Sequence, residues 1–270
     1  MDGSANLLDI DRERLAWLVR AVAANRFLPA PPAESADVGD GDFRAIGAEF
    51  LYHFVTVGGL RPTDTVLDVG CGAGRMAVPL TQYLDPQAGR YDGVDVVRPA
   101  IEWCRQAVTA RYGSFAFHHL DLHHPIYNPG GTVQTAGARL PVADASVDFV
   151  IMTSLMTHLP AAEMARYAAE TARVLRPAGR CFATFFLMNV EARAHLARGA
   201  ARLPFPPDAA GPEHHASAEV PTSAVAFDEG FVAETFAQAG LVLARPPVYG
   251  HWCGRSAAPF QDICLFGKAP

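Results

Sequence analysis

The feature that most constrains this 270-residue chain is a strand-like run that ends in a turn containing three glycines. Residues 65–69 are mainly apolar or β-branched, and glycines follow at positions 70, 72 and 74. Glycine adopts positive φ and has no Cβ, so a ligand can lie directly against the backbone of such a turn. A helical pattern over residues 74–84 follows, and the first N–H groups of that helix would face the same ligand. The stretch therefore predicts a strand, a ligand-binding turn and a helix.

Composition narrows the possible partners and the compartment. The formal net charge is −6, with Arg and Lys scattered, which argues against a nucleic-acid binder because such a protein would carry a basic patch. No apolar run approaches the ~18 residues of a membrane span, and the first residues lack a signal-peptide pattern. The five cysteines show no CxxC spacing, which indicates neither a disulfide framework nor a zinc site. We expect a cytoplasmic protein that binds no metal, no membrane and no nucleic acid.

Strand and helix patterns alternate after the glycine turn. Strands are expected at 90–96, 114–120, 147–152 and 180–187, and helices at 99–112 and 161–175. This alternation predicts an α/β fold with a doubly wound, mainly parallel sheet. Ligands of such sheets bind beyond the carboxyl ends of the strands, where Asp95, Asp121 and residues 153–158 fall. These residues are therefore expected to contribute to one site.

Further elements flank this alternating region. Helices are expected at 7–28 and 43–57, separated by a Pro- and Gly-rich loop over 29–42. Residues 189–226 read as a short helix, 190–203, followed by a loop that resembles a lid. A helix at 228–239 precedes two strands, 241–248 and 260–267, which we expect to pair as an antiparallel hairpin. The domain prediction is a helical cap at 1–60 and a ligand-binding domain at 61–270 with its lid at about 189–226.

Several of these segments resemble one known family. Residues 66–74 resemble the first motif of class I S-adenosylmethionine-dependent methyltransferases, and the later matches occur in the family's order. They are Asp95, Asp121 with Leu122, residues 140–150 and residues 173–180. More loosely, residues 249–255 with 260–263 are similar to the ending of a bacterial small-molecule subfamily. The resemblance is strong over about residues 43–190, and it implies a Rossmann-like, seven-stranded sheet with a C-terminal antiparallel hairpin and an N-terminal helical cap.

The resemblance also implies which residues hold S-adenosylmethionine. Asp68 would hold the ammonium group of the cofactor, Asp95 its ribose hydroxyls and Asp121 its adenine amino group. Arg75 would bind the cofactor carboxylate, and the carbonyl of Thr153 would lie near the sulfonium. The complete set is Asp68, Gly70, Cys71, Gly72, Gly74, Arg75, Asp95, Val96, Asp121, Leu122 and Thr153. A nicotinamide dinucleotide turn is disfavoured, because its GxGxxG pattern requires a glycine where Arg75 stands.

The sequence indicates the catalytic residues less clearly than the cofactor-binding residues. His158 leaves the fourth expected strand, close to where the methyl group would point, and its imidazole suits a general base. The alternative is that His158 only closes the pocket or caps the next helix. Histidine pairs occur at 118–119, 123–124 and 214–215, but adjacent residues on a strand point to opposite faces, which disfavours a metal site.

The acceptor is expected to be a small molecule with a hydroxyl group, such as a sugar or another hydroxylated metabolite. A small amine, and a non-catalytic regulatory protein that only binds S-adenosylmethionine, are the alternatives. Aromatic and polar residues outside the cofactor motifs are candidates for acceptor contacts. They are Tyr52, His53, Tyr127, Trp252 and Arg255.

Overall fold

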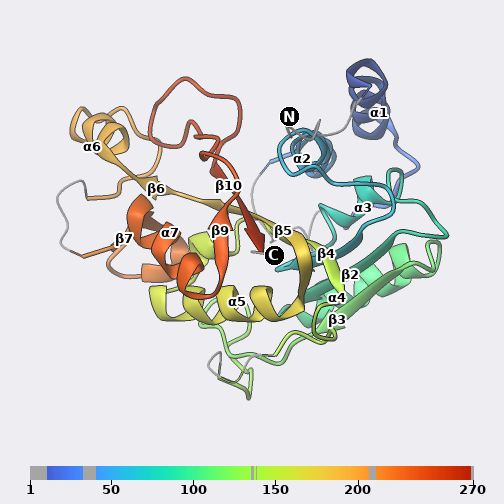
Figure 1. Cartoon of the computed structure of the whole chain (residues 1–270). Helices are drawn as coiled ribbons and strands as arrows, with labels where there is room; N and C mark the ends of the chain where they lie inside the picture. Colours follow the sequence, from blue (N-terminus) through green and yellow to red (C-terminus); the bar gives the residue numbers. More distant parts are fainter. Residues whose placement is uncertain (1–10, 33–40, 135–136, 138, 207–210, 269–270) are drawn as a thin grey trace, which may run out of the picture. The chain divides into compact units, whose positions relative to one another are not determined.

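The structure is a computed structural model that describes residues 11–32, 41–134, 137, 139–206 and 211–268 (Figure 1). It divides into two compact units, residues 1–120 and 121–270, which are described separately below. Parts of three expected segments lie outside the described residues. These are the start of the helix at 7–28, most of the loop at 29–42 and four residues of the lid at 189–226.

The first unit contains three parallel strands in the order β3-β2-β1. They are β1 (Thr65–Val69), β2 (Arg90–Asp95) and β3 (Phe115–His119). All three match the expected strands to within one residue at each end. Their apolar side chains at Val66, Leu67, Tyr91, Val94, Phe115 and Phe117 are almost completely buried.

Two N-terminal helices pack against each other in the same unit. They are α1 (Arg12–Ala24) and α2 (Phe43–Thr56). Asp11 and Asp42 begin these helices, because each carboxylate accepts hydrogen bonds from backbone N–H groups of the first turn. The expected helix at 43–57 is therefore confirmed within one residue.

The helix expected at 74–84 is wrong in length. The structure forms only α3 (Ala77–Leu80), with hydrogen-bonded turns on either side. Gly74 has a φ of 75°, which is not helical, and Pro79 has no N–H to donate to the carbonyl four residues earlier. The helix expected at 99–112 also differs, because α4 (Arg98–Cys104) continues as a π-helix over Arg105–Thr109.

The second unit contains four strands in the order β4-β5-β10-β9. β4 (Val147–Met152) and β5 (Leu175–Phe185) are parallel, whereas β10 (Asp262–Lys268) pairs antiparallel with β5 and with β9 (Leu241–Leu243). The C-terminal antiparallel hairpin is thus confirmed. The two units together contain the seven strands of a mainly parallel, Rossmann-like sheet, so the predicted fold class is confirmed.

β9 is shorter than the strand expected at 241–248. Pro246 and Pro247 have no N–H groups and cannot continue the ladder with β10. Pairing resumes at Val248, whose N–H and C=O both bond to Ile263. The helices of this unit, α5 (Ala161–Val174) and α7 (Glu229–Gln238), lie close to their expected positions and contact each other.

A second, small sheet was not expected from the sequence. It has the order β6-β8-β7, formed by Leu187–Met188, Val225–Asp228 and Glu213–His215. These strands are two to four residues long, too short for an alternating pattern to be recognised. The helix expected at 190–203 is also shorter, since α6 (Val190–Ala197) ends before Gly199, which has a φ of 68°.

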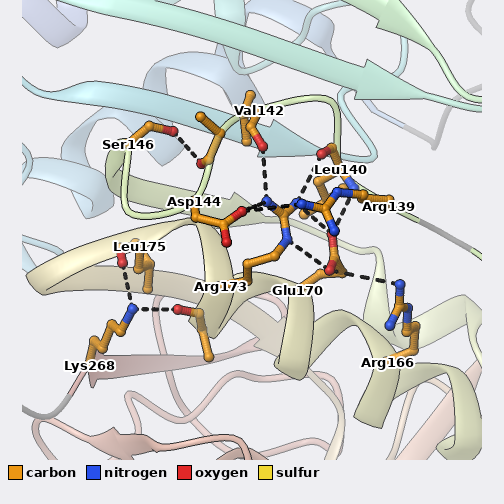
Figure 2. Close-up of polar contacts among 12 residues, drawn as sticks. Arg139, Leu140, Val142, Asp144, Ser146, Arg166, Glu170, Arg173, Leu175 and Lys268 are labelled. Atoms are coloured by element: carbon orange, nitrogen blue, oxygen red, sulfur yellow. Dashed lines mark hydrogen bonds and ion pairs between the residues drawn. The ribbon is translucent and has the colours of Figure 1, made fainter.

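One ion-pair cluster joins the end of α5 to the segment that precedes β4 (Figure 2). The guanidinium of Arg173 donates to both carboxylate oxygens of Glu170 at 2.9 and 2.7 Å, and to Asp144 at 2.7 Å. It also donates to the main-chain carbonyls of Val142 and Leu140, both at 3.0 Å. Glu170 is buried and accepts the Leu140 N–H as well. The cluster therefore joins the segment at 140–144, within one of the motif-like stretches, to Arg173, at the start of the other.

We predict that Arg173→Met lowers the free energy of unfolding by about 3 kcal/mol, because it removes both hydrogen bonds from Arg173 to the buried Glu170 carboxylate and leaves only the more distant Arg166, at 3.8 Å, as its cation. Urea unfolding followed by circular dichroism measures this. Arg176→Met is the matched control, since Arg176 pairs with Asp148 at a more exposed position and should cost less than about 1 kcal/mol. Equal losses for the two variants would contradict a special role for Arg173.

Candidate functional site

The glycine turn follows β1 in the first unit. Gly70, Gly72 and Gly74 have φ angles of 80°, 50° and 75°, a region that residues with a Cβ rarely adopt. The N–H groups of Gly70 and Cys71 donate to the carbonyl of Val94 at 2.9 and 3.1 Å, which fixes the turn to the end of β2. The turn exposes backbone without Cβ atoms at its glycines, as the sequence predicted. The four-residue α3 is too short to supply the positive helix N-terminus that was also expected.

Asp95, the last residue of β2, closes this turn. Its Oδ2 accepts the Gly72 N–H at 2.7 Å and its Oδ1 accepts the Val97 N–H at 2.8 Å. Burial raises the pKa of Asp95, although these hydrogen bonds act to lower it. Each carboxylate oxygen retains a further lone pair for a ligand hydroxyl. Asp95 therefore supports the turn, and its ribose contact stays a prediction.

Asp68 lies in β1 with no exposed surface. Its Oδ2 accepts the hydroxyl of Tyr91 at 2.6 Å, whereas its Oδ1 is buried and has no hydrogen-bond partner among the described residues. Burial raises the pKa of Asp68 to about 7; the bond from Tyr91 opposes this shift and the nearby Asp95 carboxylate adds to it. A cationic ligand could donate the hydrogen bond that this buried oxygen lacks. The turn and Asp68 therefore fit the ammonium-bearing end of S-adenosylmethionine.

The other predicted cofactor residues of the first unit have protein partners. The thiol of Cys71 is buried, and burial raises its pKa well above the ordinary value. The carbonyl of Val96 lies 3.1 Å from Nε2 of His119, and the guanidinium of Arg75 lies over the ring of Phe43 at 6.0 Å. The cofactor contacts of Cys71, Val96 and Arg75 stay predictions.

Two predicted acceptor residues occupy adjacent positions on α2. Tyr52 is 43% exposed, whereas His53 is buried and lies 3.6 Å from Glu49. Their rings contact each other edge to face, with centroids 5.7 Å apart. Of the two, only Tyr52 presents a large surface to a ligand.

In the second unit, a returning loop holds the predicted adenine-binding pair. Oδ2 of Asp121 accepts the hydroxyl of Thr132 at 2.6 Å, and Leu122 forms a parallel bridge with Val133. The side-chain amide of Asn128 donates to the carbonyl of Leu122 at 2.9 Å. The pair is thus held in an extended conformation, and its contact with adenine stays a prediction.

His158 ends a 3₁₀ turn, Met156–His158, after β4. Its Nδ1 lies 3.0 Å from the carbonyl of Thr222, so Nδ1 carries the proton and Nε2 keeps its lone pair in the neutral ring. Burial lowers the pKa of His158 below the ordinary value. His124 lies 3.4 Å from the carbonyl of His158 through Nε2, and the ring of Tyr127 meets His158 edge to face at 5.7 Å.

Trp252, a predicted acceptor residue, has no exposed surface. It packs against Phe186 and Phe205, and its Nε1 donates to Oδ2 of Asp262 at 2.7 Å. Asp262 is fully buried and also accepts the N–H groups of Leu187 and Gly250. Trp252 thus occupies a core position, and its proposed contact with an acceptor would require the ring to become accessible.

Arg255 lies at a shallow pocket of the second unit. The pocket is lined by Arg202, His251, Gly254, Arg255, Ser256 and Ala257. The guanidinium of Arg255 lies 4.6 Å from the centre of the Tyr249 ring and makes ion pairs with Glu191 at 3.1 Å and Asp262 at 3.4 Å. Two carboxylates therefore already balance its charge.

The sequence analysis missed a polar group beside Thr153. Thr153 is buried, and Ser154 follows it with a φ of 56°, bonded to Thr184 and Gln261. Gln261 lies in the 260–263 segment, which resembles the ending of a bacterial subfamily. That resemblance was the sequence feature that could have indicated this polar group. For Ser154 itself, the sequence indicated only that it lies in the 153–158 segment expected at the site.

No group of three or more His, Cys, Asp and Glu side chains in the described part of the chain is arranged to hold a metal ion. His118 and His119, adjacent on β3, bond to different partners, Asp92 and Val96. Over the same residues, no helix has the length and apolar character needed to cross a membrane.

We predict that Asp68→Asn stabilises the ligand-free protein increasingly as pH rises. The folded pKa of Asp68 is about 7, above its unfolded value, so the wild type loses stability as pH rises from about 4 to 7, by up to about 4 kcal/mol from this group. The variant keeps an acceptor for Tyr91 and lacks this loss. Urea unfolding at pH 5 and pH 8 measures the difference between the two proteins. A difference that does not grow with pH would contradict the raised pKa.

Comparisons with known proteins agree with the motifs. Residues 67–183 match the family described as "Methyltransferase domain". A curated relative, an uncharacterised 37.1 kDa protein in a transposon of Streptomyces fradiae, is 30% identical over 120 residues. That match covers 44% of this chain, and this chain spans only 29% of the relative's length.

Solved structures show the same fold at low sequence identity. The PH0226 protein of Pyrococcus horikoshii is 17% identical with a TM-score of 0.56, covering 86% of this chain and 93% of that one. Magnesium protoporphyrin IX methyltransferase of Synechocystis, solved with bound S-adenosylhomocysteine, is 17% identical with a TM-score of 0.53, covering 88% and 95%. Residues 67–183 therefore match the kind of domain that the sequence motifs predicted, and the chain shares the fold of these solved structures.

Proposed function

We propose that the chain transfers a methyl group from S-adenosylmethionine to a hydroxyl oxygen of a small molecule, such as a sugar or another hydroxylated metabolite. This proposal depends on the tautomer and the protonation state of His158. Because Nδ1 of His158 donates to the Thr222 carbonyl and burial lowers its pKa, the ring is neutral near pH 7 with the Nε2 lone pair available. A neutral imidazole can accept the proton of a hydroxyl group, which a hydroxyl nucleophile must lose.

The cofactor would be held by the residues that the family resemblance implies. When bound, S-adenosylmethionine supplies an electrophilic methyl group on a sulfonium that is a good leaving group. The glycine turn would lie under the methionine part, with its ammonium group against Oδ1 of Asp68. Asp95 would accept the ribose hydroxyls, and Asp121 the adenine amino group. The protein's part in catalysis is then to position the acceptor, exclude water and take one proton.

The proposal also includes how the chain is divided into domains and where in the cell the protein is found. Residues 1–60 would act as a cap on residues 61–270, and the segment at about 189–226 would cover the acceptor. A cytoplasmic location is proposed because all five cysteines are free and buried, as is usual in a reducing compartment.

We predict that S-adenosylmethionine binds the wild-type protein and that Asp68→Asn weakens binding by at least about tenfold, since an ammonium then loses its charged partner. Isothermal titration calorimetry at pH 7.5 measures both. Below pH 7 the wild-type affinity should fall as Asp68 takes up a proton, whereas the variant should lack this pH dependence. Absence of binding to the wild type would overturn the proposal.

We predict that His158→Gln lowers kcat for a hydroxyl acceptor about 10²- to 10⁴-fold without changing cofactor affinity. In the wild type, kcat should rise with pH and level off at a pKa below about 6.5, because only the neutral ring accepts a proton. A methyl-transfer assay on hydroxyl and amine acceptors measures both effects. His195→Gln, on α6, is the control.

The same assay distinguishes the alternatives. Transfer to amines that does not depend on His158 would favour an N-methyltransferase. Cofactor binding without transfer to any acceptor would favour a non-catalytic regulatory protein.

A further inference from the structure

The segment that leaves β4 contains a residue in an unfavourable backbone conformation. Ser154 has a φ of 56°, in the left-handed region that glycine adopts freely and other residues rarely do. Its side chain is exposed, although Thr153 and Met152 before it are buried. Ligands of open α/β sheets bind beyond the carboxyl ends of strands, which is where Ser154 lies on β4. A strained residue kept at such a position indicates a role in binding.

A ring of hydrogen bonds holds Ser154 in this conformation. Its N–H donates to Oγ1 of Thr184 at 2.8 Å, and Oγ1 of Thr184 in turn donates to Oε1 of Gln261. Nε2 of Gln261 donates back to Oγ of Ser154 at 2.9 Å. Thr184 is buried on β5 and Gln261 precedes β10, so two neighbouring strands orient the serine.

The ring also determines what the Ser154 hydroxyl can do. Oγ1 of Thr184 accepts from an N–H, so its own proton must go to an acceptor, which identifies the facing atom of Gln261 as the carbonyl oxygen. The amide nitrogen of Gln261 then occupies one lone pair of the Ser154 oxygen. The remaining bond from Ser154 to Oε1 of Gln261 is 3.1 Å, long for an O–H donor. The Ser154 hydroxyl proton can therefore turn outward to a ligand at little cost.

The same segment leads directly to His158. The hydroxyl of Thr157 donates to the carbonyl of Ser154 at 3.0 Å and thereby ties the 3₁₀ turn of His158 to the serine. One short segment thus carries the Ser154 hydroxyl and, four residues later, an imidazole whose Nδ1 is bonded to the Thr222 carbonyl.

No charged group belongs to this ring. The nearest carboxylate along the chain is Asp262, which is fully buried and directed toward the N–H groups of Leu187 and Gly250 and toward Trp252. The three ring residues themselves therefore offer a cationic amine no charged partner. A neutral amine nitrogen has a single lone pair, needed for the methyl group, so it could not also accept from Ser154. A hydroxyl oxygen has two lone pairs and can do both.

We propose that Ser154, oriented by Thr184 and Gln261, binds the nucleophilic oxygen of the acceptor and selects hydroxyl over amine acceptors. The inference rests on the proposed function. In the transfer, the acceptor oxygen bonds to the methyl carbon and the carbon–sulfur bond breaks, with its electron pair leaving on sulfur. The hydroxyl proton passes to Nε2 of His158, while Ser154 donates to the second lone pair of the oxygen.

The test uses a pair of probes that differ only at the nucleophile, phenol and aniline. Ser154→Ala should lower kcat/KM for the hydroxyl probe of a pair about tenfold, the usual effect of one lost hydrogen bond, and leave the amine probe unchanged. The hydroxyl-to-amine preference should therefore fall about tenfold. Cofactor affinity, measured by calorimetry, should not change.

Two glycine variants separate binding from backbone strain. Ser154→Gly should equal Ser154→Ala in activity but melt about 2–4 °C higher, since glycine relieves the positive φ. Ala178→Gly is the matched control: Ala178 has a φ of 60° in the irregular first part of β5, so the change should raise Tm and leave the preference intact. Thr184→Val should reproduce the loss of preference through misplacement of Gln261.

The outcomes separate a failure of the role proposed for Ser154 from a failure of the proposed methyl transfer to hydroxyl groups. If the wild type methylates a hydroxyl probe and Ser154→Ala retains the full hydroxyl-to-amine preference, this inference is overturned and the proposed function stands. If the wild type methylates only amines, or binds the cofactor and methylates no probe, the proposed function fails and the inference fails with it.

Discussion

A carboxylate that is buried must receive hydrogen bonds, and this requirement shapes both units of the protein. In the first unit, Asp95 accepts the N–H groups of Gly72 and Val97 and so closes the glycine turn. In the second, Asp262 accepts the Leu187 and Gly250 N–H groups and the indole of Trp252. The loop at 249–255 thereby lies against β10 and the small second sheet.

Asp68 is the exception. One of its oxygens is bonded to Tyr91, but the other is buried without a partner among the described residues, and burial raises its pKa to about 7. The ligand-free fold is therefore less stable at neutral pH than it would be with a neutral side chain at this position. Such a cost is typical of binding sites, where stability is given up so that a ligand can supply the missing interaction.

The family resemblance has two kinds of physical origin. The turn at 70–74 and the acids at the strand ends are predicted to hold the cofactor, whereas the contacts observed between residues 140–144 and Arg173 stabilise the fold. Arg173 and Glu170 bind the segment before β4 and leave no group free for chemistry. A motif shared with a family is therefore not by itself a sign of a ligand contact. The sequence could not separate these origins, because both require particular residues at particular spacings.

The sequence by itself determined the order of strands and helices, the glycine turn and the C-terminal hairpin. These depend on local periodicity and on residues such as Gly70 and Pro247, whose backbone properties are intrinsic. Only the tertiary structure decided that Trp252 is buried and that the short strands β6, β7 and β8 form a second sheet. It also decided that Ser154 is held by Gln261, 107 residues away. Contacts over such separations leave no periodic signal, since each partner alone resembles an ordinary loop residue.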